Sequence, residues 1–291
     1  MLKSKGRVNL GHHMAGLSTI KRFGRFKTLP TLTLLLITLC FSAFAFEDNV
    51  ARFALVIGNQ NYQQAPLKNP INDAESISAS LLELGFSVTT VLDSDSTRLK
   101  SAVSAFYGNI QQANTSQALA VFYYAGHAIQ IEHHNYLVPL DIQFGEKENF
   151  DTVLFDLNSL FAEMAKVNNV QNIVILDACR NNPFAVADTA GSRAISVGLA
   201  PLKAPFSTLI AYATEPGGVA SDGKSKNGIY TKHLLRHIDK KITIEEVFKQ
   251  VRKGVAKETH NKQIPWEHSS LLREVFINPP RNKNVPDLIA F

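Results

Sequence analysis

Two residues that could carry out nucleophilic chemistry each follow an apolar run. Cys179 comes after residues 173–178 (Ile-Val-Ile-Leu-Asp-Ala), and His127 comes after residues 119–126, whose first six residues are Leu-Ala-Val-Phe-Tyr-Tyr. A buried strand that ends in a thiol, beside one that ends in an imidazole, brings a nucleophile and its base together. The arrangement predicts Cys179 as the nucleophile and His127 as the general acid/base. The competing interpretation is a Cys that only packs in the core, together with one ordinary His among nine.

The elements that would position these residues alternate along the chain. Apolar, β-branched runs predict strands, and apolar residues at helical spacing predict helices. The expected strands cover residues 52–59, 86–92, 119–124, 173–176, 208–213 and 274–277, and the expected helices lie near 71–84, 99–110, 157–164 and 244–255, with one more between 228 and 243. Such alternation favours an α/β fold with a parallel sheet covered on both faces. Ligands bind beyond the carboxyl ends of the strands in sheets of this kind, which is where both candidate residues fall.

The amino-terminal region has the pattern of an export signal. A basic stretch precedes an apolar run at residues 29–41, and Ala43-Phe44-Ala45 follows with the small residues that a signal peptidase needs. We therefore expect residues 1–45 to be a signal peptide and the protein to be periplasmic or secreted. The alternative is an uncleaved membrane anchor through residues 29–45, although the apolar run is shorter than the ~20 residues of a spanning helix. Cys179 is then the one cysteine that the mature chain retains, which favours a functional role for it.

The net charge of +5 is concentrated at the amino terminus. Seven Lys and Arg residues precede the first acid, Glu47, and the rest of the 291-residue chain carries a net charge of −2. A mildly acidic domain gives no indication of nucleic-acid binding. No grouping of His, Cys, Asp and Glu has convincing zinc spacing, and His133 and His134 are expected to be solvated.

Several short motifs follow one another along the chain: residues 54–59 (ALVIGN), 69–74 (NPINDA), 123–127 (YYAGH), 176–184 (LDACRNNPF), 211–214 (AYAT), 220–223 (ASDG) and 265–267 (PWE). His127 and Cys179, in two of these motifs, are 52 positions apart. In content and order, the motifs resemble the caspase-like superfamily of caspases, metacaspases and bacterial caspase homologues, and the separation of 52 positions is close to the caspase-type spacing. The resemblance runs from about residue 52 to 278.

The resemblance implies a mostly parallel six-stranded sheet with helices on both faces, and a His–Cys dyad that hydrolyses peptide bonds without a metal or organic cofactor. It also implies a peptidase domain at residues 46–278, with a large-subunit-like part at 50–184, a loop at 185–204 and a small-subunit-like part at 205–278. Residues 279–291 are expected to form a carboxyl-terminal tail. Arg193, within the loop, is a candidate self-cleavage point.

The resemblance also assigns an oxyanion hole to backbone N–H groups. The donors would be Cys179 and Ala128, at a position where the family usually has Gly. Ala keeps the N–H group, but it would be strained by ~1 kcal/mol or more if the site needs a positive φ. Loss of one oxyanion donor lowers a rate by ~10²–10³. Ala128 therefore bears on how active the protein is.

Two acids match those with which metacaspase-like enzymes hold Arg or Lys. Asp177 stands two residues before the nucleophile, and Asp73 lies in the Asn-Asp-Ala motif. Paired carboxylates favour a cationic side chain through charge-assisted hydrogen bonds. Asp222, in the Ser-Asp-Gly loop, is a further candidate for the same pocket. The plainer interpretation is that Asp73 only caps its helix or faces solvent on it, and that Asp177 only orients a loop.

These observations predict a cysteine endopeptidase that cleaves protein or peptide substrates after Arg or Lys. The alternative from another class is a catalytically silent caspase-like module that binds partners, with Ala128 as the trace of lost activity. Another thiol hydrolase on a doubly wound sheet is disfavoured, because the sequence has no Gly-x-Cys-x-Gly nucleophile elbow. Trp266, the one Trp, is expected in a turn with a core or lid role.

Overall fold

The computed structural model describes residues within the compact unit Asp48–Phe291. They are residues 50–142, 153–179, 195–196, 199–200, 202–215, 218, 223 and 225–280. The segment 1–45, Asp222, Arg193 and the end of the tail lie outside the described residues, as does most of the loop 185–204. None of the described helices combines the length and the apolar character needed to cross a membrane.

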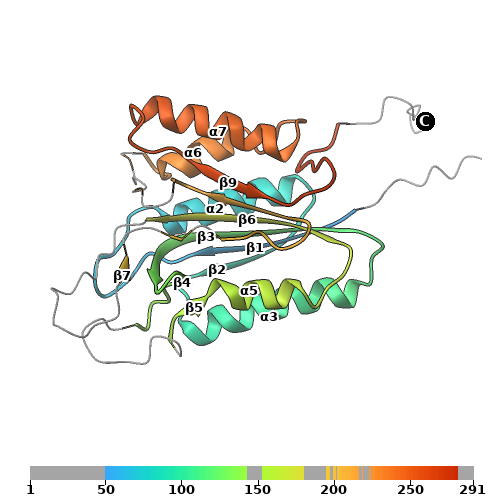
Figure 1. The fold of residues 1–291 in the computed structure, drawn as a ribbon, viewed down its shortest axis with the longest axis horizontal. Coiled ribbons are helices and arrows are strands. Elements are labelled where there is room, and N and C mark those ends of the chain that lie inside the picture. The colour runs from blue at the N-terminus through green and yellow to red at the C-terminus, as the bar shows by residue number, and fades with distance from the viewer. Residues whose placement is uncertain are drawn as a thin grey trace, which may run out of the picture. The chain divides into compact units, whose positions relative to one another are not determined.

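A central sheet with the strand order β2-β1-β3-β6-β8-β9 forms the middle layer (Figure 1). The strands on this path are β1 (Ala51–Gly58), β2 (Ser87–Leu92), β3 (Ala118–Ile131), β6 (Val170–Cys179), β8 (Thr208–Tyr212) and β9 (Trp266–Ser269). Every neighbouring pair is parallel except β8 and β9, which are antiparallel. The mostly parallel sheet of six strands is confirmed. Three short strands pair off this path: β4 (His134–Leu137), β5 (Phe155–Asp156) and β7 (Ile195–Ser196).

Helices cover both faces of the sheet (Figure 1), so the expected layering is confirmed. On one face lie α2 (Pro70–Glu83), α6 (Ile229–Leu235) and α7 (Ile244–Glu258), and on the other lie α3 (Ser96–Ala113) and α5 (Leu157–Met164). Alternate residues of β3 enter the two cores, with Tyr123 and Ala125 on the α2 face and Phe122 and Tyr124 on the α3 face. Burial on both faces explains why the strand sequences are almost continuously apolar.

Capping side chains stand at the starts of three helices. The carboxylate of Asp95 accepts a hydrogen bond from the Arg98 N–H at the start of α3, and Asp156 accepts one from the Asn158 N–H at the start of α5. The Thr243 hydroxyl accepts one from the Glu246 N–H at the start of α7. Each bond satisfies a backbone donor that has no partner within its helix.

The strand that leads to His127 is longer than its apolar run predicts. β3 continues to Ile131 and turns back through Glu132 and His133 into β4. Both turn residues have positive φ, 48° and 67°, as a two-residue hairpin of type I′ requires. No strand is expected here from the sequence, because the turn lacks the usual Gly and Asn residues. His133 and His134 are exposed, as expected for solvated residues.

The expected last strand at residues 274–277 is wrong. Val275 and Ile277 are buried at alternate positions, as in a strand, but their carbonyl oxygens accept hydrogen bonds from the Ile244 N–H and the Arg52 guanidinium. The sheet instead ends with β9, which pairs with the free edge of β8. Trp266 begins this edge strand and is 49% exposed, so the expected turn and the expected core role are wrong, while the lid role stays a prediction.

Candidate active site

The two candidate catalytic residues meet at the carboxyl edge of the sheet. His127 on β3 is the register partner of Cys179, the last residue of β6. Their strands are adjacent and parallel, so residues 52 positions apart in sequence lie side by side. His127 itself is buried, with 3% of its surface exposed.

A loop between β1 and α2 orients the imidazole of His127. Its Nε2 atom lies 2.7 Å from the carbonyl oxygen of Ala65. A carbonyl oxygen only accepts, so Nε2 carries the hydrogen, and in the neutral ring the lone pair belongs to Nδ1. The ring of Tyr62, from the same loop, lies 4.5 Å from the imidazole centroid at an interplanar angle of 50°.

Two buried tyrosine hydroxyls hold the backbone of His127. The Tyr62 hydroxyl accepts a hydrogen bond from the His127 N–H at 3.0 Å. The Tyr124 hydroxyl lies 2.8 Å from the His127 carbonyl oxygen and 3.1 Å from that of Val138. Burial raises the pKa of both tyrosines above the ordinary value, so the hydroxyls stay protonated at neutral pH.

Gly126 makes this arrangement possible. A Cβ atom at this position would lie 2.7 Å from the hydroxyl oxygens of both Tyr62 and Tyr124. Such a distance is too short for a carbon–oxygen contact, so only Gly lets the two hydroxyls approach the His127 backbone. The sequence signalled the Gly before His127, but no pattern around Tyr62 revealed its contact with a residue 65 positions away.

Ala128 has an extended backbone conformation. It pairs with Leu137 in the β3–β4 ladder, and it is not among the described residues that have a positive φ. The strain that would follow from a positive φ is therefore absent from this structure. The Val138 N–H donates to the His127 carbonyl, so Ala128 and Leu137 form a pair whose own N–H groups point away from each other. The Ala128 N–H thus points away from β4, to the side of β3 on which β6 lies.

The structure also brings together the two predicted pocket acids. Asp73 lies on α2 and Asp177 on β6, and a Cβ atom at Gly228 would be 3.1 Å from Asp73 Oδ2 and 3.7 Å from Asp177 Oδ2. The pKa of Tyr123 is well above its ordinary value, mainly because of burial, with further contributions from the charges of Asp177 and Asp73. Asp73 and Asp177, 104 positions apart in sequence, therefore create one negative region beside Gly228, the N-cap of α6.

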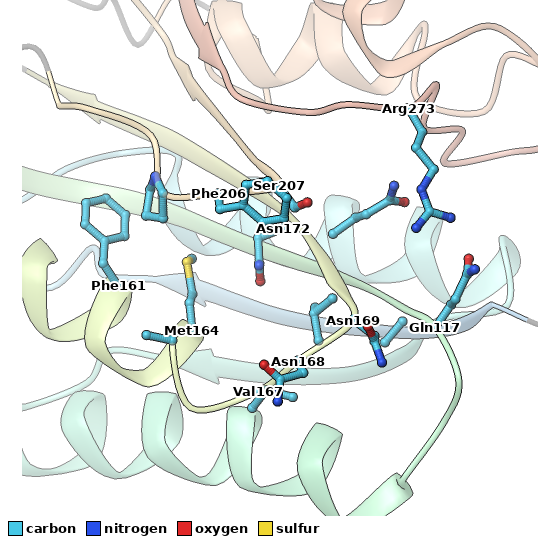
Figure 2. A pocket seen from close by; sticks show the side chains of 15 residues that line it. Gln117, Phe161, Met164, Val167, Asn168, Asn169, Asn172, Phe206, Ser207 and Arg273 are labelled. Carbon is cyan, nitrogen blue, oxygen red and sulfur yellow. The ribbon is translucent and has the colours of Figure 1, made fainter.

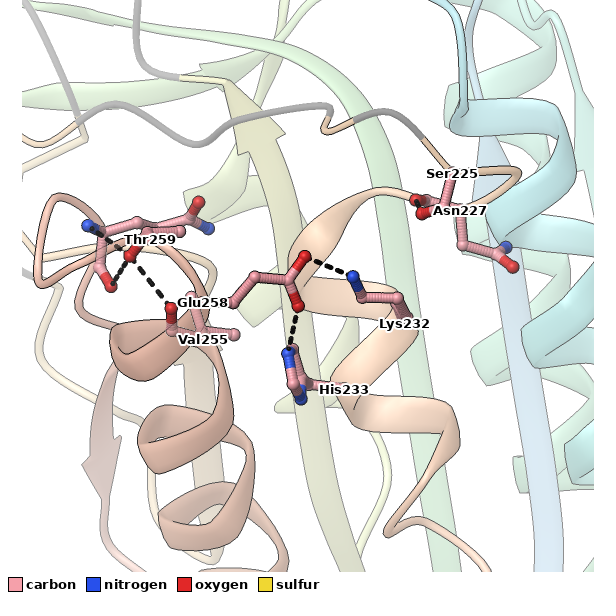
Figure 3. A network of polar contacts seen from close by, with 8 residues as sticks. Ser225, Asn227, Lys232, His233, Val255, Glu258 and Thr259 are labelled. Carbon is pink, nitrogen blue, oxygen red and sulfur yellow. Dashed lines mark hydrogen bonds and ion pairs between the residues drawn. The ribbon is translucent and has the colours of Figure 1, made fainter.

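An acidic side chain of α7 binds two side chains of α6 (Figure 3). Glu258 on α7 forms an ion pair with Lys232 and accepts a hydrogen bond of 2.8 Å from Nε2 of His233. The imidazole of His233 packs against Gly254, where a Cβ atom would overlap it. This contact fixes the helix whose first residues meet the two acids.

A separate cavity of about 510 Å³ lies at the other end of the strands, where β3, β6 and β8 begin (Figure 2). Gln117, Asn169 and Ser207, which immediately precede β3, β6 and β8, line it together with Phe206 and Arg273. The length of β6 separates it from Cys179 by roughly 30 Å. It contains none of the predicted site residues. Among the described residues, no group of three or more His, Cys, Asp and Glu could hold a metal ion.

Comparisons with known proteins identify the family of this chain. The model of the caspase domain family matches residues 51–277, which is most of the chain. The chain belongs to the caspase domain family. This membership confirms the resemblance and the expected fold.

Two mammalian proteins are similar to the chain. The human mucosa-associated lymphoid tissue lymphoma translocation protein 1 is 29% identical over 238 residues, which cover 79% of this chain and 27% of that protein. The mouse homologue of that protein is 30% identical over 200 residues, which cover 66% of this chain and 22% of the mouse protein. The chain thus spans about a quarter of the length of these relatives.

Proposed function

We propose that this protein is a cysteine endopeptidase in which Cys179 is the nucleophile and His127 the general acid/base. The observation that carries the proposal is the register pairing of these two residues at the carboxyl edge of the sheet. The Ala65 carbonyl adds support, because it fixes the imidazole in the tautomer whose Nδ1 can accept a proton. A thiol beside such a base gains thiolate character.

The reaction would follow the usual order of covalent peptide hydrolysis. The Cys179 thiolate attacks the scissile carbonyl, and the imidazolium of His127 protonates the leaving amine. Water then attacks the acyl-enzyme, with His127 as its base, and the thiol is restored. We assign the backbone N–H groups of Ala128 and Cys179 to the developing oxyanion, since the Ala128 N–H points to the side of β3 on which β6 lies.

We further propose that the substrate residue before the scissile bond is Arg or Lys. Asp73 and Asp177 place two carboxylates in one region, where a cationic side chain gains charge-assisted hydrogen bonds. Asp222 is assigned to the border of the same pocket from its motif. The substrates are therefore proteins or peptides that expose a basic residue.

For the cellular location, we propose export through residues 1–45, with residues 29–45 as a membrane anchor if the signal is not cleaved. The basic stretch, the apolar run and the Ala43-Phe44-Ala45 site support this proposal. Amino-terminal sequencing of the protein purified from its host distinguishes the two forms. A first residue at position 46 indicates cleavage.

The function is tested with fluorogenic peptides that differ only in the residue before the leaving group: Arg, Lys, Asp and citrulline. Citrulline has the shape of Arg without its charge. We expect cleavage of the Arg and Lys peptides, and loss of at least ~10³-fold in rate in Cys179→Ala and His127→Ala. A folded protein that cleaves none of the peptides and does not react with an acyloxymethyl ketone at Cys179 contradicts the proposal and favours the silent binding module.

A further inference from the structure

The two residues before α6 and the first turn of this helix contact both acids of the proposed pocket. The Gly228 N–H donates to Asp73 at 3.0 Å, and the Asn227 side-chain amide donates to the same carboxylate at 2.9 Å. Three residues later, the Thr231 hydroxyl donates to Asp177 Oδ2 at 2.6 Å. The start of α6 and the two residues before it therefore bind two carboxylates from different elements.

The contact of Thr231 with Asp177 continues into the core. The Thr231 hydroxyl oxygen lies 2.6 Å from the hydroxyl oxygen of Tyr123 on β3. Thr231 has one hydroxyl hydrogen, which it gives to the carboxylate, so Tyr123 must be the donor in the second contact. The result is a directed chain from Tyr123 through Thr231 to Asp177, and its two hydroxyl residues are fully buried.

The two acids differ in how they are exposed. Asp73 is buried, with 3% of its surface exposed, and it accepts hydrogen bonds from the backbone of Gly228, the N-cap of α6, and from the side-chain amide of Asn227. Asp177 is only half-buried. A cationic side chain from solvent can therefore reach Asp177 more directly than it can reach Asp73. The buried Asp73 adds negative charge to the same region. The orientation of Asp177 then decides how well the cation is bound.

We propose that Thr231, supported by Tyr123, is a positioning residue that orients Asp177 as the carboxylate in direct contact with the basic side chain of the substrate. This inference rests on the proposed function and assigns a specificity role to two residues outside the acid pair. The short, buried and directed hydroxyl chain carries it. Hydrogen bonds to a charged acceptor are stronger than neutral ones, so removal of this donor has a measurable effect.

The kinetic test compares Thr231→Val with Thr231→Ser on matched Arg and citrulline peptides. Val keeps the shape of Thr without the hydroxyl, whereas Ser keeps the hydroxyl. We expect Thr231→Val to raise KM for the Arg peptide about tenfold with little change in kcat and no change for citrulline. Thr231→Ser should retain the Arg preference, and Tyr123→Phe should lower it about threefold.

The matched control is Tyr107→Phe. Tyr107 is also a fully buried tyrosine with one hydrogen bond, to Asn172 Oδ1 at 3.0 Å, but it lies near the opposite edge of the sheet. We expect this variant to keep the Arg/citrulline ratio of the parent. A general loss of packing lowers the activity on both peptides and leaves the ratio unchanged. A folded Thr231→Val whose ratio stays within about twofold of the parent therefore overturns the inference.

A binding measurement separates this inference from the proposed catalysis. Fluorescence polarisation of a labelled Arg-ended peptide is recorded with the Cys179→Ala protein and with Cys179→Ala/Thr231→Val. About tenfold weaker binding in the double variant supports the role of Thr231 even if the parent cleaves nothing. Equal binding by the two proteins, or no binding by Cys179→Ala, overturns it.

Discussion

Nε2 of His127 lies 2.7 Å from the carbonyl oxygen of Ala65, in a loop that the sequence places 62 positions earlier. The same loop supplies Tyr62, whose hydroxyl binds the His127 N–H. The proposed base is thus held at its ring and at its backbone by one segment between β1 and α2. The contacts of this segment, the backbone of Ala128 and the contacts of α6 lead to four predictions besides the experiments already described.

Tyr62→Phe should slow catalysis more than it changes substrate binding. The variant leaves the buried His127 N–H without its acceptor, at a cost of ~1–3 kcal/mol in the free energy of unfolding. We expect kcat to fall about tenfold on the Arg peptide, since the imidazole moves from its aligned position. Tyr107→Phe should lose similar stability with kcat unchanged. Equal kcat losses in the two variants would show that Tyr62 acts only through stability.

Ala128→Gly should bring no gain in activity. Because Ala128 is already extended and has no positive φ, Gly relieves no strain there. We expect kcat/KM within about twofold of the parent, and a loss of ~0.5–1 kcal/mol in stability from the greater backbone entropy of Gly in a strand. Steady-state kinetics and thermal unfolding measure the two effects. A large increase in rate would instead support the interpretation of Ala128 as a trace of lost activity.

Gly228→Ala should weaken the binding of basic substrates. The new Cβ atom would lie 3.1 Å from Asp73 Oδ2, a tight contact that must move the carboxylate or the start of α6. We expect KM for the Arg peptide to rise about three- to tenfold, with less effect on the citrulline peptide. Gly108→Ala in α3 is the matched control, since a Cβ atom there meets nothing within 4 Å. It should stabilise the protein by ~0.5–1 kcal/mol without changing KM.

Stability should fall on acidification through the contact between α6 and α7. Burial lowers the pKa of His233 from its ordinary value of 6.5, so the unfolded chain binds the proton more readily as the pH drops below 6.5. The hydrogen bond from Lys232 lowers the pKa of Glu258 from 4.5. The ionised Glu258 therefore stabilises the folded state above that pH, and this stabilisation is lost as the pH falls below it. Both effects lower the stability of the folded state as the pH falls.

The measurement is the melting temperature between pH 7 and pH 4. We expect His233→Gln to reduce the fall of the melting temperature between pH 6.5 and 5. Part of the fall should remain, because burial also lowers the pKa of His237. Glu258→Gln should cost about 1 kcal/mol at pH 7. A parent protein whose melting temperature rises as the pH falls from 7 to 5 would contradict this account.

Much of the fold could be predicted because both faces of the sheet are buried. Continuous apolar runs marked β1, β3, β6 and β8, and apolar residues at helical spacing marked α2 and α7. His127 and Cys179 could be proposed because the carboxyl ends of parallel strands meet at one edge. The ordered motifs located Asp73 and Asp177 by their resemblance to a family.

The tertiary structure decided what depends on register and on distant partners. β9 forms at Trp266–Ser269 because the edge of β8 is free there, although the alternation of apolar residues at 274–277 is the stronger strand signal. Asp73 and Asp177 lie in one region because folding places both carboxylates beside Gly228, the N-cap of α6. Tyr62 and Thr231 gave no signal, since a hydroxyl group acquires its role from a partner that folding brings within hydrogen-bond distance. Local patterns therefore predicted most of the strands and helices and indicated His127 and Cys179 as candidate reactive residues. The partners of these residues depended on the tertiary structure, because local patterns encode burial and secondary structure but not contacts between distant residues.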